Sequence, residues 1–293
     1  MPMNRPVVVG VDGSPSSLVA AEHAARAAVR RRRPLHLVHG YLHPLGYGVP
    51  LNPYDLGVPA PTEDSRRMVE ATAAKLTDRW PGLTVEVHQV AGGPAATLVA
   101  ASRRAELVVV GSRGLGGFAG LLLGSVGSQV AAHAHCPVLV VRPEEQPIPV
   151  DGPVVAGVDG SAGSRLAAGY AAAEAAGRDV PLVLLHVGPP GMDRPVPEEV
   201  EESQAAHRAE AVRLLAEASA AVRAEHPDLV VREHPVAAAT PTQGLVEASG
   251  TASLLAVGTR GRGGFVGLLL GSVSQGVLQH AHCPVLVAHP YDE

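Results

Sequence analysis

A glycine-rich pattern that could hold a phosphate group occurs twice in this chain of 293 residues. The first copy is Gly111-Ser112-Arg113-Gly114, followed after nine residues by Gly124-Ser125. The second copy lies 147 positions later, as Gly258-Thr259-Arg260-Gly261, followed after nine residues by Gly271-Ser272. Glycine lets the backbone approach a ligand closely, and the free N–H groups at the start of a helix attract phosphate. We therefore expect two phosphate cradles, one in each half of the chain.

A second polar turn accompanies each glycine pattern. It is Val11-Asp12-Gly13-Ser14 in the first half and Val158-Asp159-Gly160-Ser161 in the second, again at an offset of 147. Both turns follow an apolar run of the kind expected for a strand buried on both faces. In open parallel sheets, ligands bind beyond the carboxyl ends of the strands, near the point where the strand order reverses. The aspartates are therefore expected near the cradles.

Neither of the two common nucleotide fingerprints is present in the sequence. The first turn holds Asp-Gly-Ser where a dinucleotide fold would carry Gly-x-Gly-x-x-Gly, and the P-loop lysine is missing. Arg113 and Arg260 are the only obvious cations beside the cradles. The glycine pattern is a stronger sign of phosphate binding because it is duplicated, with about two-thirds identity between residues 111–141 and the second copy.

The elements that must position these turns alternate between strand and helix. In the first half we predict strands at 7–11, 35–39, 83–90, 107–110 and 138–141, with helices beginning at Pro15 and covering 63–79, 95–104 and 125–134. In the second half we predict strands at 154–158, 182–187, 230–235, 254–257 and 285–288, with helices over 162–176, 198–225, 243–249 and 272–281. Right-handed crossovers then give two repeated, doubly wound (Rossmann-like) α/β domains, each a five-stranded parallel sheet with helices on both faces.

The repeat also predicts the domain boundaries. We assign residues 1–142 to a first nucleotide-binding domain, 143–153 to a proline-rich linker, and 154–293 to a second nucleotide-binding domain. The halves differ in one stretch, where Tyr41 to Pro61 is expected to be a loop and the long helix from Glu198 to Glu225 stands in its place.

Composition narrows the function classes. Apolar residues make up 46% of the chain and aromatic residues 3%, which favours a buried sheet covered by alanine-rich helices. A formal charge of −5 argues against a nucleic-acid partner, and no apolar run is long enough to span a membrane. The amino terminus lacks the features of a signal peptide, and the two cysteines, Cys136 and Cys283, occupy equivalent positions. We therefore expect a cytoplasmic protein.

These motifs together resemble the universal stress protein family, in its tandem two-domain form. The family signature of Gly, two residues, Gly, nine residues, Gly and then Ser or Thr fits both glycine patterns, and the Val-Gly-Val-Asp-Gly-Ser opening and His-Cys-Pro-Val-Leu-Val close are also typical. The resemblance covers nearly the whole chain. It implies that each repeat binds ATP or ADP with Mg²⁺ or Mn²⁺ on the phosphates, and that the protein acts as a nucleotide-dependent stress-response sensor or regulator.

The resemblance also implies roles for single residues. Asp12 and Asp159 would contact the adenosine end, Val38 and Leu185 would line the adenine pocket, and Val110 and Val257 would pack on the base. The phosphates would be held by the glycines and by the amides of Ser125-Val126 and Ser272-Val273. The next position, often a hydroxyl residue in the family, is Ser274 in the second repeat and Gly127 in the first. The last strand of each half would form a dimer contact, here an intramolecular pseudo-dimer, and a homodimer of whole chains stays open.

Three other interpretations stay open. The glycines could serve tight turns only, with Ser125 and Ser272 capping helices. The same sites could hydrolyse ATP slowly, although the motif offers no catalytic base beyond Asp12 and Asp159. The run His133-Ala134-His135-Cys136, repeated at 280–283, could bind zinc, but it spans a helix end and a strand start, so we assign no metal-ligating residues.

Overall fold

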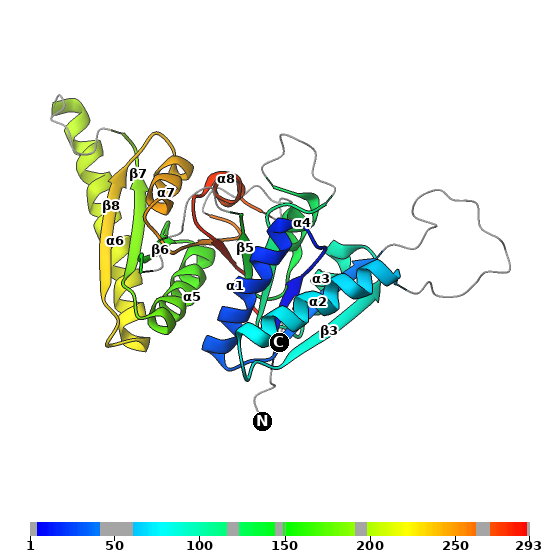
Figure 1. Ribbon diagram of the computed structural model, residues 1–293. Coiled ribbons are helices and arrows are strands. Elements are labelled where there is room, and N and C mark those ends of the chain that lie inside the picture. The colour runs from blue at the N-terminus through cyan, green and yellow to red at the C-terminus, as the bar shows by residue number, and fades with distance from the viewer. Residues whose placement is uncertain are drawn as a thin grey trace, which may run out of the picture. The chain divides into compact units, whose positions relative to one another are not determined.

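The chain divides into two compact α/β units in the computed structural model (Figure 1). The structure describes residues 5–41, 61–115, 123–143, 149, 151–190, 198–261 and 270–291. The first unit comprises residues 1–143 together with 290–293, and the second comprises residues 144–289. The predicted fold class is confirmed, because each unit contains a parallel five-stranded sheet with helices on both faces.

The first unit alternates strands and helices throughout its described residues. Its parallel strands lie in the order β3-β2-β1-β4-β5, so the order reverses between β1 and β4. The elements are β1 (Val7–Gly10), α1 (Pro15–Arg31), β2 (Leu35–Tyr41), α2 (Glu63–Arg79), β3 (Val85–Ala91), α3 (Pro94–Ser102), β4 (Leu107–Gly111), α4 (Ser125–His133) and β5 (Val138–Val141).

The second unit repeats this plan. Its parallel strands lie in the order β8-β7-β6-β9-β10, with the reversal between β6 and β9. The elements are β6 (Val154–Gly157), α5 (Ala162–Arg178), β7 (Leu182–Gly188), α6 (Glu198–Glu225), β8 (Val231–Ala237), α7 (Pro241–Ser249), β9 (Leu254–Gly258), α8 (Ser272–His280) and β10 (Val285–Ala288).

Small side chains allow helices and strands to approach closely in both units. Helix α1 packs against β1 and β4 through fully buried alanines such as Ala20, Ala24 and Ala28. On the other face of the sheet, α3 contacts β1 and β2, and a Cβ on Gly10 would lie 2.7 Å from Leu98 Cδ1. The core is therefore built from aliphatic strands and alanine faces, as the composition predicts.

Several predicted ends move by one to three residues. Helices α3 and α7 begin at Pro94 and Pro241, because proline is tolerated in the first helical turn. Strand β2 continues to Tyr41, and the rest of the predicted loop lies outside the described residues. Helix α6 covers 198–225 as predicted, but its second half lies 147 positions from α2. It is thus α2 with an amino-terminal extension, and only that extension falls at the repeat position of the 41–61 stretch.

The last described residues belong to the first unit, whereas the sequence assigned them to the second domain. The Tyr291 hydroxyl donates to the Glu106 carbonyl at 2.9 Å, and the Arg5 guanidinium carbon lies 4.9 Å from the centre of the Tyr291 ring.

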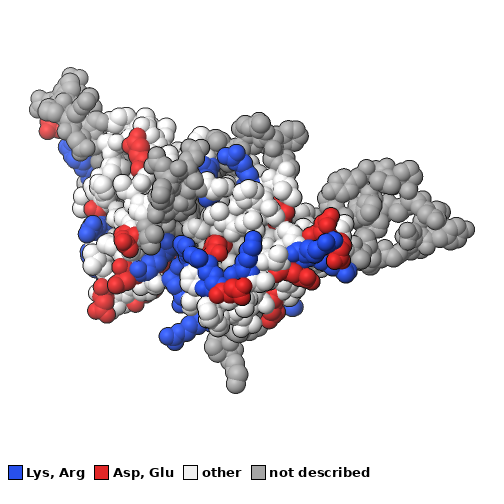
Figure 2. Space-filling view, in the orientation of Figure 1, with Lys and Arg blue, Asp and Glu red and all other residues white. Residues whose placement is uncertain are grey.

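Charged side chains of both signs are interspersed on the face that Figure 2 shows, as far as its residues are described. On α2, for example, Arg67 lies 3.7 Å from Glu63 and 3.6 Å from Asp64. Among the helices in the described part of the chain, none combines the length and the apolar character needed to cross a membrane.

Candidate functional site

The two polar turns of the first repeat meet at Asp12. Its Oδ1 accepts hydrogen bonds from the Ser14 N–H at 3.0 Å and from the Ser14 hydroxyl at 2.6 Å. Its Oδ2 accepts from the Leu115 N–H at 3.0 Å, and a Cβ on Gly114 would lie 2.6 Å from the same oxygen. The glycine is therefore required because the carboxylate approaches the loop backbone. Asp12 joins the turn after β1 to the loop after β4.

Hydrogen bonds set the protonation state of this carboxylate. Burial alone would raise the pKa of Asp12, but donors from Ser14, Ser17 and the Leu115 N–H together lower it from its ordinary value of 3.8. Asp12 is therefore ionised at neutral pH, and both of its oxygens accept hydrogen bonds from the protein. A carboxylate held in this way organises the loops and is poorly placed to abstract a proton.

The second repeat builds the same junction. The Ser161 N–H donates to Asp159 Oδ1 at 2.9 Å, and a Cβ on Gly261 would lie 2.5 Å from Asp159 Oδ2. The turn before α5 is also the same, because Gly160 has a φ of +80° and Ser161 accepts from the Ser164 N–H at 3.1 Å as the helix cap. The first repeat has the matching values at Gly13, with φ of +83°, and at the Ser14 cap, at 3.2 Å.

A second close approach fixes where each glycine pattern begins. A Cβ on Gly258 would lie 2.6 Å from the carbonyl carbon of Gly163, and one on Gly111 would lie 2.6 Å from Ser16 Oγ. The end of the fourth strand of each repeat therefore lies directly against the first turn of the helix that follows the Asp-Gly-Ser turn.

The helices that follow the glycine patterns begin without a side-chain cap. Gly124 and Gly271 are the N-cap residues of α4 and α8, and neither helix start has a side-chain cap hydrogen bond. Ser125 and Ser272 are the first helical residues, so the alternative that they cap these helices was wrong. The two N-cap glycines are held by backbone hydrogen bonds of 2.7 Å. The Gly124 N–H donates to the Ser112 carbonyl, and the Gly271 N–H donates to the Thr259 carbonyl. Each helix start is thus suited to an anion.

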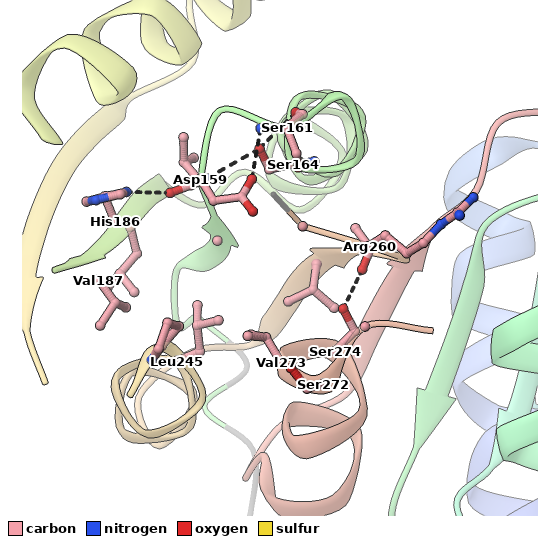
Figure 3. Close-up of a pocket in the computed structure, with 18 residues that line it drawn as sticks. Asp159, Ser161, Ser164, His186, Val187, Leu245, Arg260, Ser272, Val273 and Ser274 are labelled. Atoms are coloured by element: carbon pink, nitrogen blue, oxygen red, sulfur yellow. Dashed lines mark hydrogen bonds between the residues drawn. The ribbon is translucent and has the colours of Figure 1, made fainter. Parts of the chain in front are cut away.

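These features surround a cavity of about 530 Å³ in the second repeat (Figure 3). Such a volume lies within the range of about 300–1,000 Å³ that is usual for small-molecule sites. Of the residues predicted for this repeat, all but Gly160 line the cavity. The lining residues that were predicted are Val158, Asp159, Ser161, Leu185, Val257, Gly258, Arg260, Gly261, Gly271, Ser272, Val273 and Ser274. In the first repeat, Val11, Val38 and Val110 are buried at the matching positions. The centres of both loops, residues 116–122 and 262–269, lie outside the described residues.

Two predicted residues play a different part from the one expected. The Ser274 hydroxyl donates to the Gly258 carbonyl at 2.6 Å, so its single O–H ties α8 to the end of β9 and is not free to donate to a phosphate. Arg260 is among the lining residues, but its side chain extends away from the other labelled residues in Figure 3.

Sequence reasoning missed a further group of lining residues. They are Gly157, Ser164, His186, Val187, Pro241 and Leu245. His186 Nδ1 lies 2.7 Å from the Val158 carbonyl, and His39 Nδ1 lies 2.8 Å from the Val11 carbonyl. Because a carbonyl only accepts, Nδ1 carries the proton in both rings, which leaves Nε2 of the neutral ring as an acceptor. The recurrence of this histidine at the repeat offset was the available signal.

The structure does not bring together the possible zinc ligands His133, His135 and Cys136. Among the described residues, the group of metal-ligand atoms that converges lies elsewhere. Cys136 is fully buried, and burial raises the pKa of its thiol to about 12, so the thiol is protonated at neutral pH.

Comparison with known proteins gives consistent matches over nearly the whole chain. The model of the universal stress protein family matches residues 3–142 and 152–289. The universal stress protein Rv2623 of Mycobacterium tuberculosis is 38% identical to this chain, over 96% of this chain and 95% of its own length. The universal stress protein Rv2005c of the same organism is 40% identical, over 96% of each chain. A crystal structure of a universal stress protein from Archaeoglobus fulgidus matches 99% of both chains with a TM-score of 0.70 at 20% identity.

Proposed function

Because this chain belongs to the universal stress protein family, we propose that each repeat binds one adenine nucleotide, ATP or ADP. The protein would then act as a nucleotide-dependent sensor or regulator in a stress response. The observation that carries the proposal is the cavity of about 530 Å³ that opens on the uncapped start of α8. This cavity has both an apolar wall that could contact a base and a helix start that could bind phosphates.

The lining suggests how the nucleotide would lie. Leu185, Val187, Leu245 and Val257 offer an apolar wall for the adenine ring. The amides of Ser272 and Val273, at the start of α8, would donate to the phosphates. His186 also lines the cavity, and with Nδ1 bonded to the Val158 carbonyl, its Nε2 could accept from an amino or hydroxyl group.

A divalent ion on the phosphates fits this lining only as a companion of the nucleotide. Asp159 is the only carboxylate among the described lining residues, and one of its oxygens already accepts from the Ser161 N–H. Mg²⁺ or Mn²⁺ would therefore be held by phosphate oxygens and water, as Mg²⁺ often is in proteins. When bound, the ion would neutralise part of the phosphate charge.

We propose a holding site rather than an efficient hydrolase. A general base must reach the attacking water, and the hydrogen bonds to both oxygens of Asp12 oppose that role. Slow hydrolysis of ATP at the same sites is the alternative. Turnover of many ATP molecules per minute that is lost in Asp12→Ala would overturn the proposal of a holding site.

We also propose that the repeats associate as an intramolecular pseudo-dimer. β5 and β10 end the sheet of their own units, and their sequences, Val-Leu-Val-Val and Val-Leu-Val-Ala, are wholly apolar. Such an edge is rarely left exposed. Small-angle scattering that fits two independently moving units would contradict this. The two cysteines are buried and form no disulfide, which fits a cytoplasmic location.

The nucleotide content of the purified protein tests the binding proposal. Gel-filtered protein is denatured, and the supernatant is separated by ion-exchange chromatography against adenine nucleotide standards. Two nucleotides per chain support two working sites, and one per chain, assigned by a variant in each repeat, supports a single site. Absence of co-purified nucleotide, together with no binding of added ATP in calorimetry, would leave the glycines as turn residues only.

A further inference from the structure

Three potential metal ligands converge on one face of the first sheet. They are His36 on β2 with Glu86 and His88 on β3, and their ligand atoms all lie within 4.8 Å of one another. We propose that His36, Glu86 and His88 form a binding site for Zn²⁺ or a similar first-row divalent transition metal. This inference does not rest on the proposed nucleotide function.

The distances already suit a tetrahedral ion. His36 Nε2 lies 3.3 Å from Glu86 Oε2, and His88 Nε2 lies 3.5 Å from the same oxygen. Two ligands bound at about 2.0–2.1 Å in tetrahedral geometry are separated by about 3.3 Å. The three side chains would thus need little movement to enclose an ion, and two imidazoles with one carboxylate are a ligand set that Zn²⁺ favours.

The strand register explains this convergence. His36 and Glu86 are direct partners across β2 and β3, and His88 is two residues beyond Glu86 on the same face. The two imidazole rings lie 4.5 Å apart between centroids. The arrangement rests on backbone pairing, so the ligands are held by the sheet.

The histidine nitrogens are ready to accept an ion. His88 Nε2 is shielded from solvent and has no hydrogen-bond partner in the described structure. A buried polar atom without a partner is costly, and a bound ion would satisfy it.

The fourth coordination position has room beside it. His36 and His88 both line a cavity of about 710 Å³ beneath α3, which Val38, Arg5 and Arg104 also line. The two guanidinium groups favour a water or a small anion as the fourth ligand. Because β3 is the edge strand of its sheet, the ion would join that edge to β2.

The second repeat lacks this ligand set and therefore serves as an internal control. The register of β7 and β8 puts Val183, Arg232 and His234 at the positions of His36, Glu86 and His88. An arginine in place of the glutamate would repel a cation, so one ion per chain is expected.

Zinc titration of untagged, EDTA-treated and nucleotide-free protein tests the site. We expect calorimetry and elemental analysis to give one Zn²⁺ per chain with micromolar or tighter affinity. Substitution of Co²⁺ should give the visible absorption of a tetrahedral N/O site. His36→Gln and His88→Gln should each weaken Zn²⁺ binding at least tenfold, whereas His234→Gln, the matched change in the second repeat, should leave it unchanged.

Circular dichroism of each variant establishes that it is folded, and its nucleotide content is measured separately. No Zn²⁺ binding by the parent protein would overturn the site. So would binding that survives both glutamine changes, or binding that is lost instead in the double variant His133→Gln/His135→Gln.

Discussion

The two repeats agree at the loop junction and differ in how a neighbouring charge is paired. In both, an aspartate after the first strand lies so near a glycine of the second loop that a Cβ would approach it to 2.6 Å or 2.5 Å. The arginine at the end of the first helix finds its carboxylate in different places. Arg31 lies 3.7 Å from Glu106, on the segment before β4, and Glu106 also pairs with Arg33 at 2.5 Å. Arg178 instead lies 2.7 Å from Glu174 within its own helix.

The partners have exchanged position between the repeats. Ala27 occupies the first-repeat position of Glu174, and Ser253 occupies the second-repeat position of Glu106. Pairing of the arginine can therefore be achieved from either element, because only the charge must be satisfied. The aspartate–glycine junction allows no such exchange, because both the acceptor geometry and the missing Cβ are needed. Retention of this junction in both repeats is the stronger sign of a shared ligand.

The largest effect should come from adding a methyl group at the junction. Gly114→Ala and Gly261→Ala place a Cβ against the aspartate carboxylate, so each should reduce nucleotide binding in its own repeat at least tenfold. Gly169→Ala, on α5, is the matched control, since its Cβ would meet nothing within 4 Å. Calorimetry with ATP measures the result. Equal affinities for all three variants would show that the junction does not shape the site.

Removing the carboxylate partner should separate the two ways of pairing the arginine. Glu174 is buried, so Glu174→Ala leaves Arg178 without its partner and should cost about 2 kcal/mol of unfolding free energy. Glu106 is more exposed, and Glu106→Ala should cost about 1 kcal/mol. Urea unfolding gives both values. A larger loss for Glu106→Ala would reverse this interpretation.

The junction carboxylate should also give a pH-dependent contribution to stability. Because the pKa of Asp12 is lowered in the folded protein, its ionised form stabilises the fold above the ordinary pKa of 3.8, and this stabilisation is lost as the pH falls through the lower folded pKa. Asp12→Asn should therefore cost about 1–2 kcal/mol at pH 7, and the difference from the parent protein should narrow below about pH 4.

Urea unfolding across this pH range checks the Asp12 prediction. Asp64→Asn, at an exposed carboxylate whose ion pair is also exposed, is the control and should have little effect at any pH. A constant difference between Asp12→Asn and the parent down to low pH would contradict it.

The smallest effect is expected where the helix starts differ. Ser274→Gly removes the bond to the Gly258 carbonyl and should destabilise by about 1 kcal/mol. In the reverse change, Gly127→Ser, the new Cβ would lie 3.4 Å from the Gly111 carbonyl and 3.3 Å from Leu123 Cδ1. Gly127→Ser should stabilise the protein slightly if the Leu123 side chain shifts to accommodate the new Cβ. Thermal unfolding of the pair tests this, and opposite signs to those given would refute it.

The sequence predicted the order of the elements because continuous apolar runs and alanine-rich helices leave few alternatives. It also predicted which turns meet, from their place at strand ends. It could not predict that Asp12 is held by Leu115, because 103 positions separate them and the contact depends on loop conformation. The cluster of His36 and Glu86 was missed for the same reason, since only the register of β2 and β3 makes them partners. Ser274 was assigned to ligand binding because a sequence motif does not show which acceptor a hydroxyl group donates to.

The cysteines give each repeat its own reporter of local opening. Cys136 and Cys283 precede β5 and β10, and both thiols are buried. Because burial raises the pKa of Cys136 to about 12, it reacts with a thiol reagent only after its surroundings open. The rate of labelling at each cysteine, resolved by peptide mass, therefore measures how often that half of the chain opens. Slower labelling on adding nucleotide would report, repeat by repeat, how strongly occupancy suppresses these fluctuations.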